Sequence, residues 1–279
     1  MSEHHIASAF DRDLEGIQAN LMRMGGLVES AIQSATKALI DRDPDLAAKV
    51  RVDDKKIDAL DETIHAECAR LIALRQPIAS DLRTILGVMR IVANLERIGD
   101  YAKNLAKRTV VLLDLPEVPG ASGSISRMAR EVQAMLTDAL EATLKQDATL
   151  AESVRHRDVE VDEMYVAFFR ELVSFMLEDP RKITACMHYH FIGKNIERMG
   201  DHAVFGGGGL VLGEEAADVF DLGGRGGDGD AHVAGAGELL AGGVTVLVVG
   251  DVTVVGRHGE FLVDDAVLLL LAVEVIVAL

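Results

Sequence analysis

Tryptophan is absent from this chain of 279 residues, and aromatic residues of any kind are scarce, with eight phenylalanines and three tyrosines. The two cysteines, Cys68 and Cys186, stand alone in the sequence, so they show neither metal-ligand nor redox spacing. They are consistent with ordinary burial in a reducing compartment. The first residues, Met1 to His5, lack the charged-then-apolar pattern of a secretory signal. We therefore expect a cytoplasmic protein.

Positive charge is also in short supply. The chain carries 28 lysines and arginines against 45 acidic residues, which gives a formal net charge of −17. Such a balance argues against binding to nucleic acid or to an anionic membrane surface. It favours cations or basic protein surfaces as partners.

Several catalytic patterns are missing as well. The sequence holds neither a P-loop nor a Gly-x-Ser-x-Gly motif. A di-iron carboxylate enzyme needs Glu-x-x-His on each of two helices, and only Glu62 to His65 supplies it. His188 and His190 beside Cys186 have no counterpart elsewhere in the chain, so we interpret them as polar positions on a packed helix. An enzyme is therefore the less favoured alternative.

What the chain does contain is a duplicated acidic motif. Residues 94–100 have the sequence Asn-Leu-Glu-Arg-Ile-Gly-Asp, and residues 195–201 have Asn-Ile-Glu-Arg-Met-Gly-Asp. In an α-helix, residues four apart lie on the same face, so each copy projects two carboxylates side by side. Two like charges at this spacing cost a helix about 0.2–0.5 kcal/mol. A sequence that accepts this cost twice is expected to use the pair.

The apolar spacing predicts an all-α fold. Helices are expected over residues 10–41, 44–75 and 79–113, with breaks at Asp43-Pro44 and Gln76-Pro77. Residues 116–120 form a linker, and the pattern then begins again at an offset of 104 residues, which becomes 101 after Asp179-Pro180. Such an internal duplication predicts two tandem, pseudo-symmetric three-helix bundles over residues 1–115 and 123–203.

Each repeat offers four acids as candidate metal ligands. Glu96 and Asp100 in the first repeat correspond to Glu197 and Asp201 in the second. The middle helix of each repeat adds a second pair four residues apart. These weaker candidates are Asp54 and Asp58 in the first repeat and Asp158 and Asp162 in the second.

Carboxylates in clusters bind hard or borderline cations such as Mg²⁺, Mn²⁺, iron or Ca²⁺. On a helical wheel, Glu96 and Asp100 fall opposite the apolar stripe, so the acids are expected on an open outer face. The competing interpretation is that the protein is a plain helical scaffold. In that case the acids form a solvated surface with salt bridges to Lys103 and Lys107.

These motifs resemble those of the PhoU family of bacterial phosphate-uptake regulators. The resemblance covers about residues 1–203 and rests on the segments 76–83, 94–106 and 194–203. It implies a non-enzymatic, metal-binding protein, often dimeric, whose cofactor is a divalent or trivalent metal ion such as iron, Mn, Mg or Zn. It also implies an adaptor between a phosphate ABC transporter ATPase and a phosphate-sensing histidine kinase. Such an adaptor restrains phosphate uptake and holds the phosphate-starvation response off.

The tail departs from this pattern. Residues 204–279 contain 17 of the 26 glycines and contain no Lys, Ser, Pro, Asn, Gln, Tyr, Cys or Met. Four consecutive glycines at 206–209, each costing about 1 kcal/mol in a helix relative to alanine, predict that the last helix is truncated near residue 203. We hypothesise an out-of-frame translation of this Gly/Val-rich tail. The alternative is a small domain with strands at 244–249 and 252–255. The apolar segment 267–279 is too short to span a bilayer.

Overall fold

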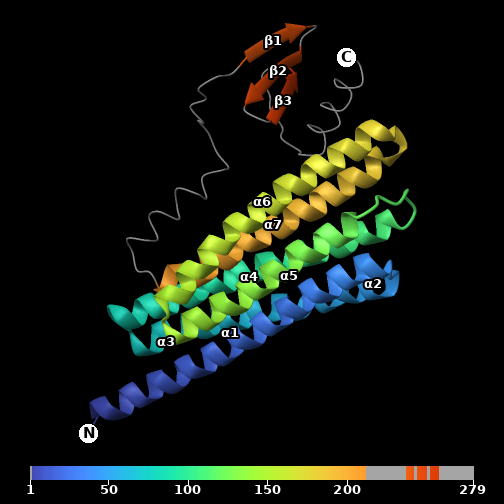
Figure 1. The fold of residues 1–279 in the computed structure, drawn as a ribbon. Helices are drawn as coiled ribbons and strands as arrows, with labels where there is room; N and C mark the ends of the chain where they lie inside the picture. Colours follow the sequence, from blue (N-terminus) through green and yellow to red (C-terminus); the bar gives the residue numbers. More distant parts are fainter. Residues whose placement is uncertain (1, 212–236, 242–243, 250–251, 258–279) are drawn as a thin grey trace. The chain divides into compact units, whose positions relative to one another are not determined.

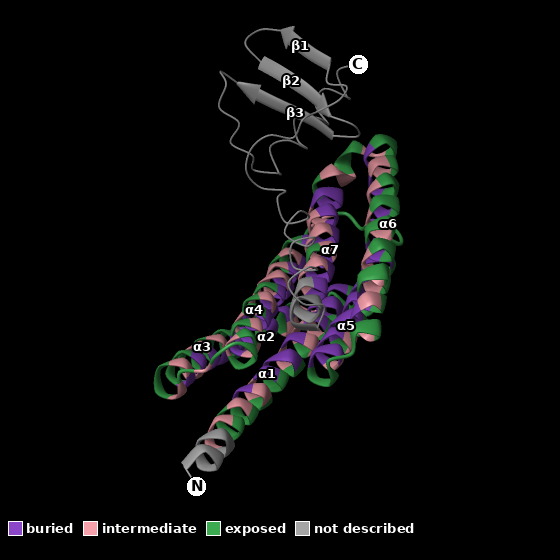
Figure 2. Cartoon of the chain, turned by 90° about the vertical axis from the view of Figure 1, so that its left-hand side faces the viewer, coloured by how far each residue is buried: buried purple, intermediate pink, exposed green. Residues whose placement is uncertain are grey.

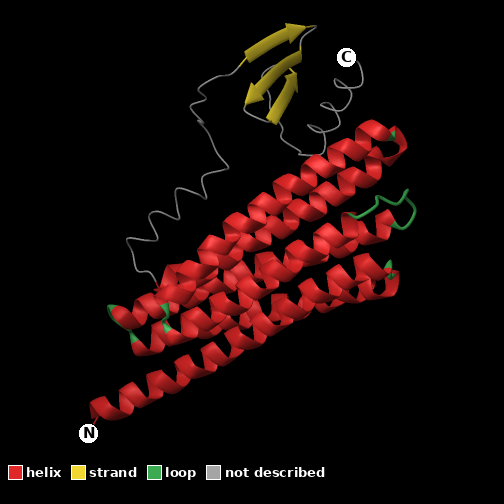
Figure 3. Ribbon diagram, in the orientation of Figure 1, coloured by secondary structure: helices red, strands yellow, loops and turns green. Residues whose placement is uncertain are grey.

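The computed structural model of the chain describes residues 2–211, 237–241, 244–249 and 252–257 (Figure 1). Residues 1–223 form one compact unit and residues 224–279 a second. Within residues 2–211 nearly every residue is helical, and loops are confined to the ends of the helices (Figure 3).

The first repeat forms three long rods. Helix α1 spans Ser2–Asp41, α2 spans Pro44–Asp53, α3 spans Lys55–Arg75, and α4 spans Ser80–Leu112. Helices α2 and α3 run almost continuously, because Asp54 between them keeps right-handed helical backbone angles. The amide of Ile57 there bonds to the carbonyl of Asp54, three residues back, at 2.8 Å. The predicted second helix is therefore present, with one tightened turn at Asp54.

The second repeat has the same plan. Helix α5 spans Ala121–Lys145, α6 spans Ala148–Glu178, the short 3₁₀ helix η1 spans Pro180–Lys182, and α7 spans Ile183–Val211. Asp43 and Asp147, which are equivalent in the two repeats, cap α2 and α6 with side-chain bonds to the second and third amides that follow. The predicted breaks and the duplicated all-α plan are thus confirmed.

The prediction that the last helix is truncated near residue 203 is wrong. Helix α7 continues through Gly206–Gly209 and ends at Val211. Glycine lowers helix propensity, but extending an existing helix costs far less than starting one, and α7 is already packed along its preceding length.

The core follows the predicted apolar stripes. Within α1, Ile17, Leu21, Met24 and Val28 are buried, and within α4, Leu95 and Ile98 are buried. Buried positions run along the inner faces of the rods while exposed ones cover their outer faces (Figure 2). The two repeats also pack on each other, since α4 lies against α7 and α1 against α5.

Residues 224–279 are described only in part. Strands β1 (Gly237–Ala241), β2 (Val244–Val249) and β3 (Val252–Arg257) pair antiparallel in the order β1-β2-β3. Val246 is the partner of Leu239 on one side and of Val255 on the other. Strands β2 and β3 cover the segments 244–249 and 252–255, where the alternative of a small domain places strands. The apolar segment 267–279 lies outside the described residues, and no described helix combines the length and hydropathy that a membrane span needs.

Candidate metal centre

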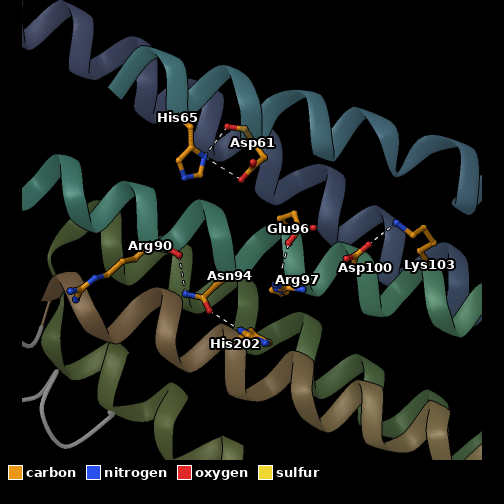
Figure 4. A network of polar contacts seen from close by, with 9 residues as sticks. All are labelled: Asp61, His65, Arg90, Asn94, Glu96, Arg97, Asp100, Lys103 and His202. Atoms are coloured by element: carbon orange, nitrogen blue, oxygen red, sulfur yellow. Dashed lines mark hydrogen bonds and ion pairs between the residues drawn. The ribbon is translucent and has the colours of Figure 1, made fainter. Parts of the chain in front are cut away.

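Five acids gather along the seam between α3 and α4. This first acidic cluster comprises Asp54, Asp58, Asp61, Glu96 and Asp100, which influence one another electrostatically. Figure 4 shows Asp61 on α3 facing Glu96 on α4. The side chain of Asp54 is only 6% exposed, whereas that of Asp100 is 33% exposed. The structure therefore brings all four predicted ligands of the first repeat to one seam.

A lysine bridges the two sides of the first acidic cluster. The Nζ atom of Lys103 donates to Asp54 Oδ2 at 2.5 Å and to Asp100 Oδ1 at 2.6 Å. Burial works to lower the pKa of this lysine, but its hydrogen bonds to the two carboxylates outweigh that effect and raise the pKa. Lys103 is thus a fixed positive charge at neutral pH.

The other members of the first acidic cluster carry less compensation. Burial raises the pKa of Glu96, and the neighbouring carboxylate of Asp100 raises it further. Asp58, the exposed member, has its pKa raised by partial desolvation and by the charge of Asp54. Arg97 lies 3.8 Å from Glu96 but is itself largely exposed. Negative charge is therefore crowded along this seam at the acids that make no hydrogen bond to Lys103.

Four acids form a second acidic cluster along the matching seam between α6 and α7. It comprises Asp158, Asp162, Glu197 and Asp201. Burial raises the pKa of Asp158 to about 7, and the charges of Asp201, Asp162 and Glu197 add to the effect. Burial and the charge of Glu197 raise the pKa of Asp201 to about 6. The four predicted ligands of the second repeat are thus also brought together.

Two oxygens of the second acidic cluster have no partner among the residues that the structure describes. Asp158 Oδ1 and Glu197 Oε2 are buried and make no hydrogen bond within that part of the chain. The other oxygen of Glu197 accepts from Lys194 Nζ at 2.6 Å. A buried acceptor without a donor costs about 1–3 kcal/mol, and more when it is charged. A proton or a cation bound at this cluster would relieve that cost.

The expectation that the acids lie on an open outer face is wrong for Asp54 and Glu197. Asp54 is buried, and Glu197 has only 13% of its side chain exposed. A helical wheel for a single helix places these acids away from its own apolar stripe but takes no account of the neighbouring helix. Here α3 covers the acidic face of α4, and α6 covers that of α7.

Sequence reasoning missed the glycines that make both seams possible. A Cβ atom at Gly99 would lie 3.0 Å from Ile57 Cδ1, and one at Gly200 would lie 2.7 Å from Asp158 Oδ1. Each glycine directly precedes the aspartate of the duplicated motif, so its recurrence in both repeats was the signal in the sequence that could have revealed it. Because glycine has no side chain, the middle helix of each repeat can approach the last helix closely at this position.

The second acidic cluster fits a cation better than the first. In residues 9–204, whose side chains the structure describes, no three His, Cys, Asp or Glu side chains are arranged to hold a metal ion as they stand. The two orphaned oxygens of the second acidic cluster nevertheless supply ligand atoms that nothing else uses. In the first acidic cluster, the ammonium of Lys103 already satisfies the equivalent aspartate.

His190, Cys68 and Cys186 behave as packing groups. His190 is buried against Tyr165, Phe169 and Phe191. Burial raises the pKa of Cys68 and of Cys186 to about 11, so neither thiol is activated. Their surroundings agree with the interpretation of these positions as structural.

Comparison with known proteins identifies matches to both repeats. A family model described as the PhoU domain matches residues 21–109 and again 125–204. Among curated proteins, the chain is 43% identical over 203 residues to a "Phosphate-specific transport system accessory protein PhoU homolog" of Caulobacter vibrioides, which covers 73% of this chain and 88% of that protein. A protein of the same description from Pseudomonas aeruginosa is 42% identical over 72% of this chain and 83% of its own length.

Solved structures match the same part of the chain. The crystal structure of PhoU from Pseudomonas aeruginosa superposes with a TM-score of 0.70 at 41% identity, over 73% of this chain and 97% of that one. The phosphate transport system regulatory protein PhoU from Streptococcus pneumoniae superposes with a TM-score of 0.66 at 29% identity, over 73% of this chain and 95% of that one. The matched share of the chain corresponds to the helical unit.

Proposed function

Because this chain belongs to the PhoU family, we propose that it regulates phosphate uptake and represses the phosphate-starvation response. A PhoU-family chain is a regulatory accessory protein and not an enzyme. The observation that carries the proposal is the pair of family repeats, each with its acidic motif placed on the last helix of a three-helix unit.

The proposed role is that of an adaptor in the cytoplasm, between the ATPase of a phosphate ABC transporter and a phosphate-sensing histidine kinase. Relatives are described as accessory proteins of a phosphate-specific transport system, and one solved structure as a regulatory protein of that system. A net charge of −17 suits contact with basic protein surfaces. We include in the proposal a homodimer in solution, which sedimentation of the full chain would test.

The proposal assigns metal binding to the second acidic cluster. Asp158 and Glu197 supply buried oxygens that lack a donor within the described residues, and Asp162 and Asp201 lie beside them. A bound Mn²⁺, Mg²⁺, Zn²⁺ or iron ion would neutralise these carboxylates and tie α6 to α7. The four acids come from two helices, so a single ion bound to them would contact both α6 and α7.

Deletion of the gene tests the regulatory function. In high phosphate, loss of a repressor is expected to switch on a phosphate-starvation reporter such as alkaline phosphatase. A plasmid copy of the wild-type chain should switch it off again. An unchanged reporter in the deletion strain would contradict the proposed function.

Matched variants separate a metal-binding regulator from a plain helical scaffold. Glu197→Gln with Asp201→Asn removes charge from the second acidic cluster, whereas Glu160→Gln removes charge from an exposed position on α6. The first variant should lose bound metal and fail to complement the deletion at unchanged helicity by circular dichroism, while the second should behave as wild type. Equal complementation by both would favour the scaffold.

A further inference from the structure

The two acidic clusters are related by the repeat but differ at one position. Asp100 is followed three residues later by Lys103, and its counterpart Asp201 is followed three residues later by Val204. Lys103 contacts one carboxylate on each side of the seam, at Asp54 and at Asp100. Val204 is buried and carries no charge. The same place in the fold therefore holds a cation in one repeat and an aliphatic side chain in the other.

The consequence of this difference is visible in the equivalent aspartates. Asp54 Oδ2 accepts a charge-assisted hydrogen bond from Lys103 at 2.5 Å. Its counterpart Asp158 leaves Oδ1 buried and without a partner in the described part of the chain. A buried carboxylate is tolerated when an opposite charge lies against it and is costly when none does. The first repeat has met this requirement with its own side chain.

The lysine of the second repeat does not play the same part. Lys194 donates to Glu197 from the preceding turn of the same helix, three residues earlier, and its side chain is 35% exposed. It also lies over the ring of Tyr165, 5.4 Å from the centroid. It therefore sits at the edge of the second acidic cluster and makes no hydrogen bond to Asp158.

We propose that Lys103 is a built-in cation that replaces metal in the first acidic cluster, so that this chain binds metal through its second repeat and not through its first. The inference rests on the metal-binding role proposed above for the second acidic cluster. It makes the two halves functionally unequal: the α3–α4 seam is held closed by the protein alone, and only the α6–α7 seam responds to metal.

The test removes the charge of Lys103 and keeps the approximate size of its side chain. Lys103→Met replaces the lysine with an unbranched, uncharged side chain, and Mn²⁺ bound to the full chain is measured by equilibrium dialysis with elemental analysis. The variant is expected to bind more Mn²⁺ than the wild type, and adding Asp54→Asn with Asp100→Asn should abolish the gain. If Lys103→Met binds no more Mn²⁺ than wild type, the inference is overturned.

The reciprocal substitution covers the case in which Lys103→Met fails to fold. Val204→Lys places an ammonium three residues after Asp201, as Lys103 follows Asp100, and Val204→Met is the control for size. Val204→Lys is expected to lower Mn²⁺ affinity at least about tenfold, while Val204→Met keeps it. Equal affinities in these two variants would count against the inference.

Failure of the inference and failure of the proposed metal role give different results. If the wild type binds no Mn²⁺, or binds no more than the variant with Glu197→Gln and Asp201→Asn, the role assigned to the second acidic cluster is refuted. A gain on Lys103→Met in that same experiment still supports the built-in cation, because the gain depends on Asp54 and Asp100 alone. Absence of both signals overturns both.

Discussion

Asp158 is the residue at which stability and function are most clearly opposed. Its Oδ1 atom is buried without a donor among the described side chains, and the charges of three further carboxylates act on it. Asp158→Asn removes the charge and keeps the shape, so the metal-free chain is expected to gain roughly 1–3 kcal/mol in free energy of unfolding. Urea unfolding of the metal-free chain measures this gain.

The same substitution should remove the stabilisation that Mn²⁺ gives to the wild type, because a ligand stabilises only the state that binds it. Asp54→Asn is the matched comparison. It takes a carboxylate away from Lys103 and leaves that ammonium partly buried, so we expect it to destabilise the chain. Stabilisation by both substitutions would contradict the inequality of the two clusters.

His188 gives the clearest pH dependence. It lies partly buried with Nδ1 3.4 Å from Arg108 Nη1, and burial, then the charge of Arg108, lowers its pKa below the ordinary 6.5. The unfolded chain therefore takes up this proton at a higher pH than the folded chain does. By linkage, stability attributable to His188 is lost as pH falls below about 6.5.

We expect His188→Gln to weaken that loss, as seen in the midpoints of urea unfolding measured from pH 7.5 down to 5. The raised pKa values of Asp158 and Asp201 act in the opposite direction, so the informative quantity is the difference between variant and wild type. His156, which is exposed on α6, is the control position. A pH profile that His188→Gln and His156→Gln change equally would show that the contact with Arg108 has no effect.

At the scale of helices, the approach of neighbouring rods depends on one small residue per seam. Gly200→Ala places a methyl group 2.7 Å from Asp158 Oδ1, so the carboxylate must move. We expect Mn²⁺ affinity to fall about 10–100-fold, as for changes that disturb a ligand's orientation, while helicity is retained. Calorimetric titration measures the affinity.

Gly99→Ala is the matched substitution in the first repeat, where the nearest atom is the flexible tip of Ile57. It should cost stability through packing and leave Mn²⁺ binding unchanged, because Lys103 already bonds to Asp54 and Asp100 across this seam. A loss of Mn²⁺ in both variants would mean that the two seams do not act separately.

The helices themselves could be predicted from local patterns. Apolar spacing, the caps at Asp43 and Asp147 and the proline breaks are all properties of short segments, and the structure confirms them. The burial and the pairing of the acids, in contrast, depend on residues that are distant in the sequence. Whether Asp54 is exposed depends on α4, some fifty positions further along the chain, and whether it is paired depends on Lys103. Sequence patterns grouped the eight acids but could not show that Asp54 is paired with Lys103 while Asp158 Oδ1 has no donor among the described residues.

At the scale of the whole molecule, the two repeats are joined along an extended face. Helix α4 lies against α7, and polar contacts cross between them. His202 Nδ1 lies 2.7 Å from Asn94 Oδ1. The guanidinium carbon of Arg108 lies 4.1 Å from the centroid of the Phe191 ring. Asn94 and His202 are seen in Figure 4. The sequence indicated two bundles from its duplication, and a duplication alone carries no information about how far the copies depend on each other.

A fragment comprising residues 1–115 tests that dependence. It retains α1 to α4 but loses α5 and α7, against which α1 and α4 pack in the full chain. The exposed apolar face is expected to make the fragment associate or lose cooperative unfolding. Sedimentation and thermal circular dichroism measure the two effects, with residues 1–223 as the control because they form one compact unit. A monomeric, cooperatively folding fragment would instead show that each repeat is an independent domain. Metal binding between α6 and α7 would then not be expected to change the structure or stability of the first repeat, because the two repeats would not depend on packing against each other.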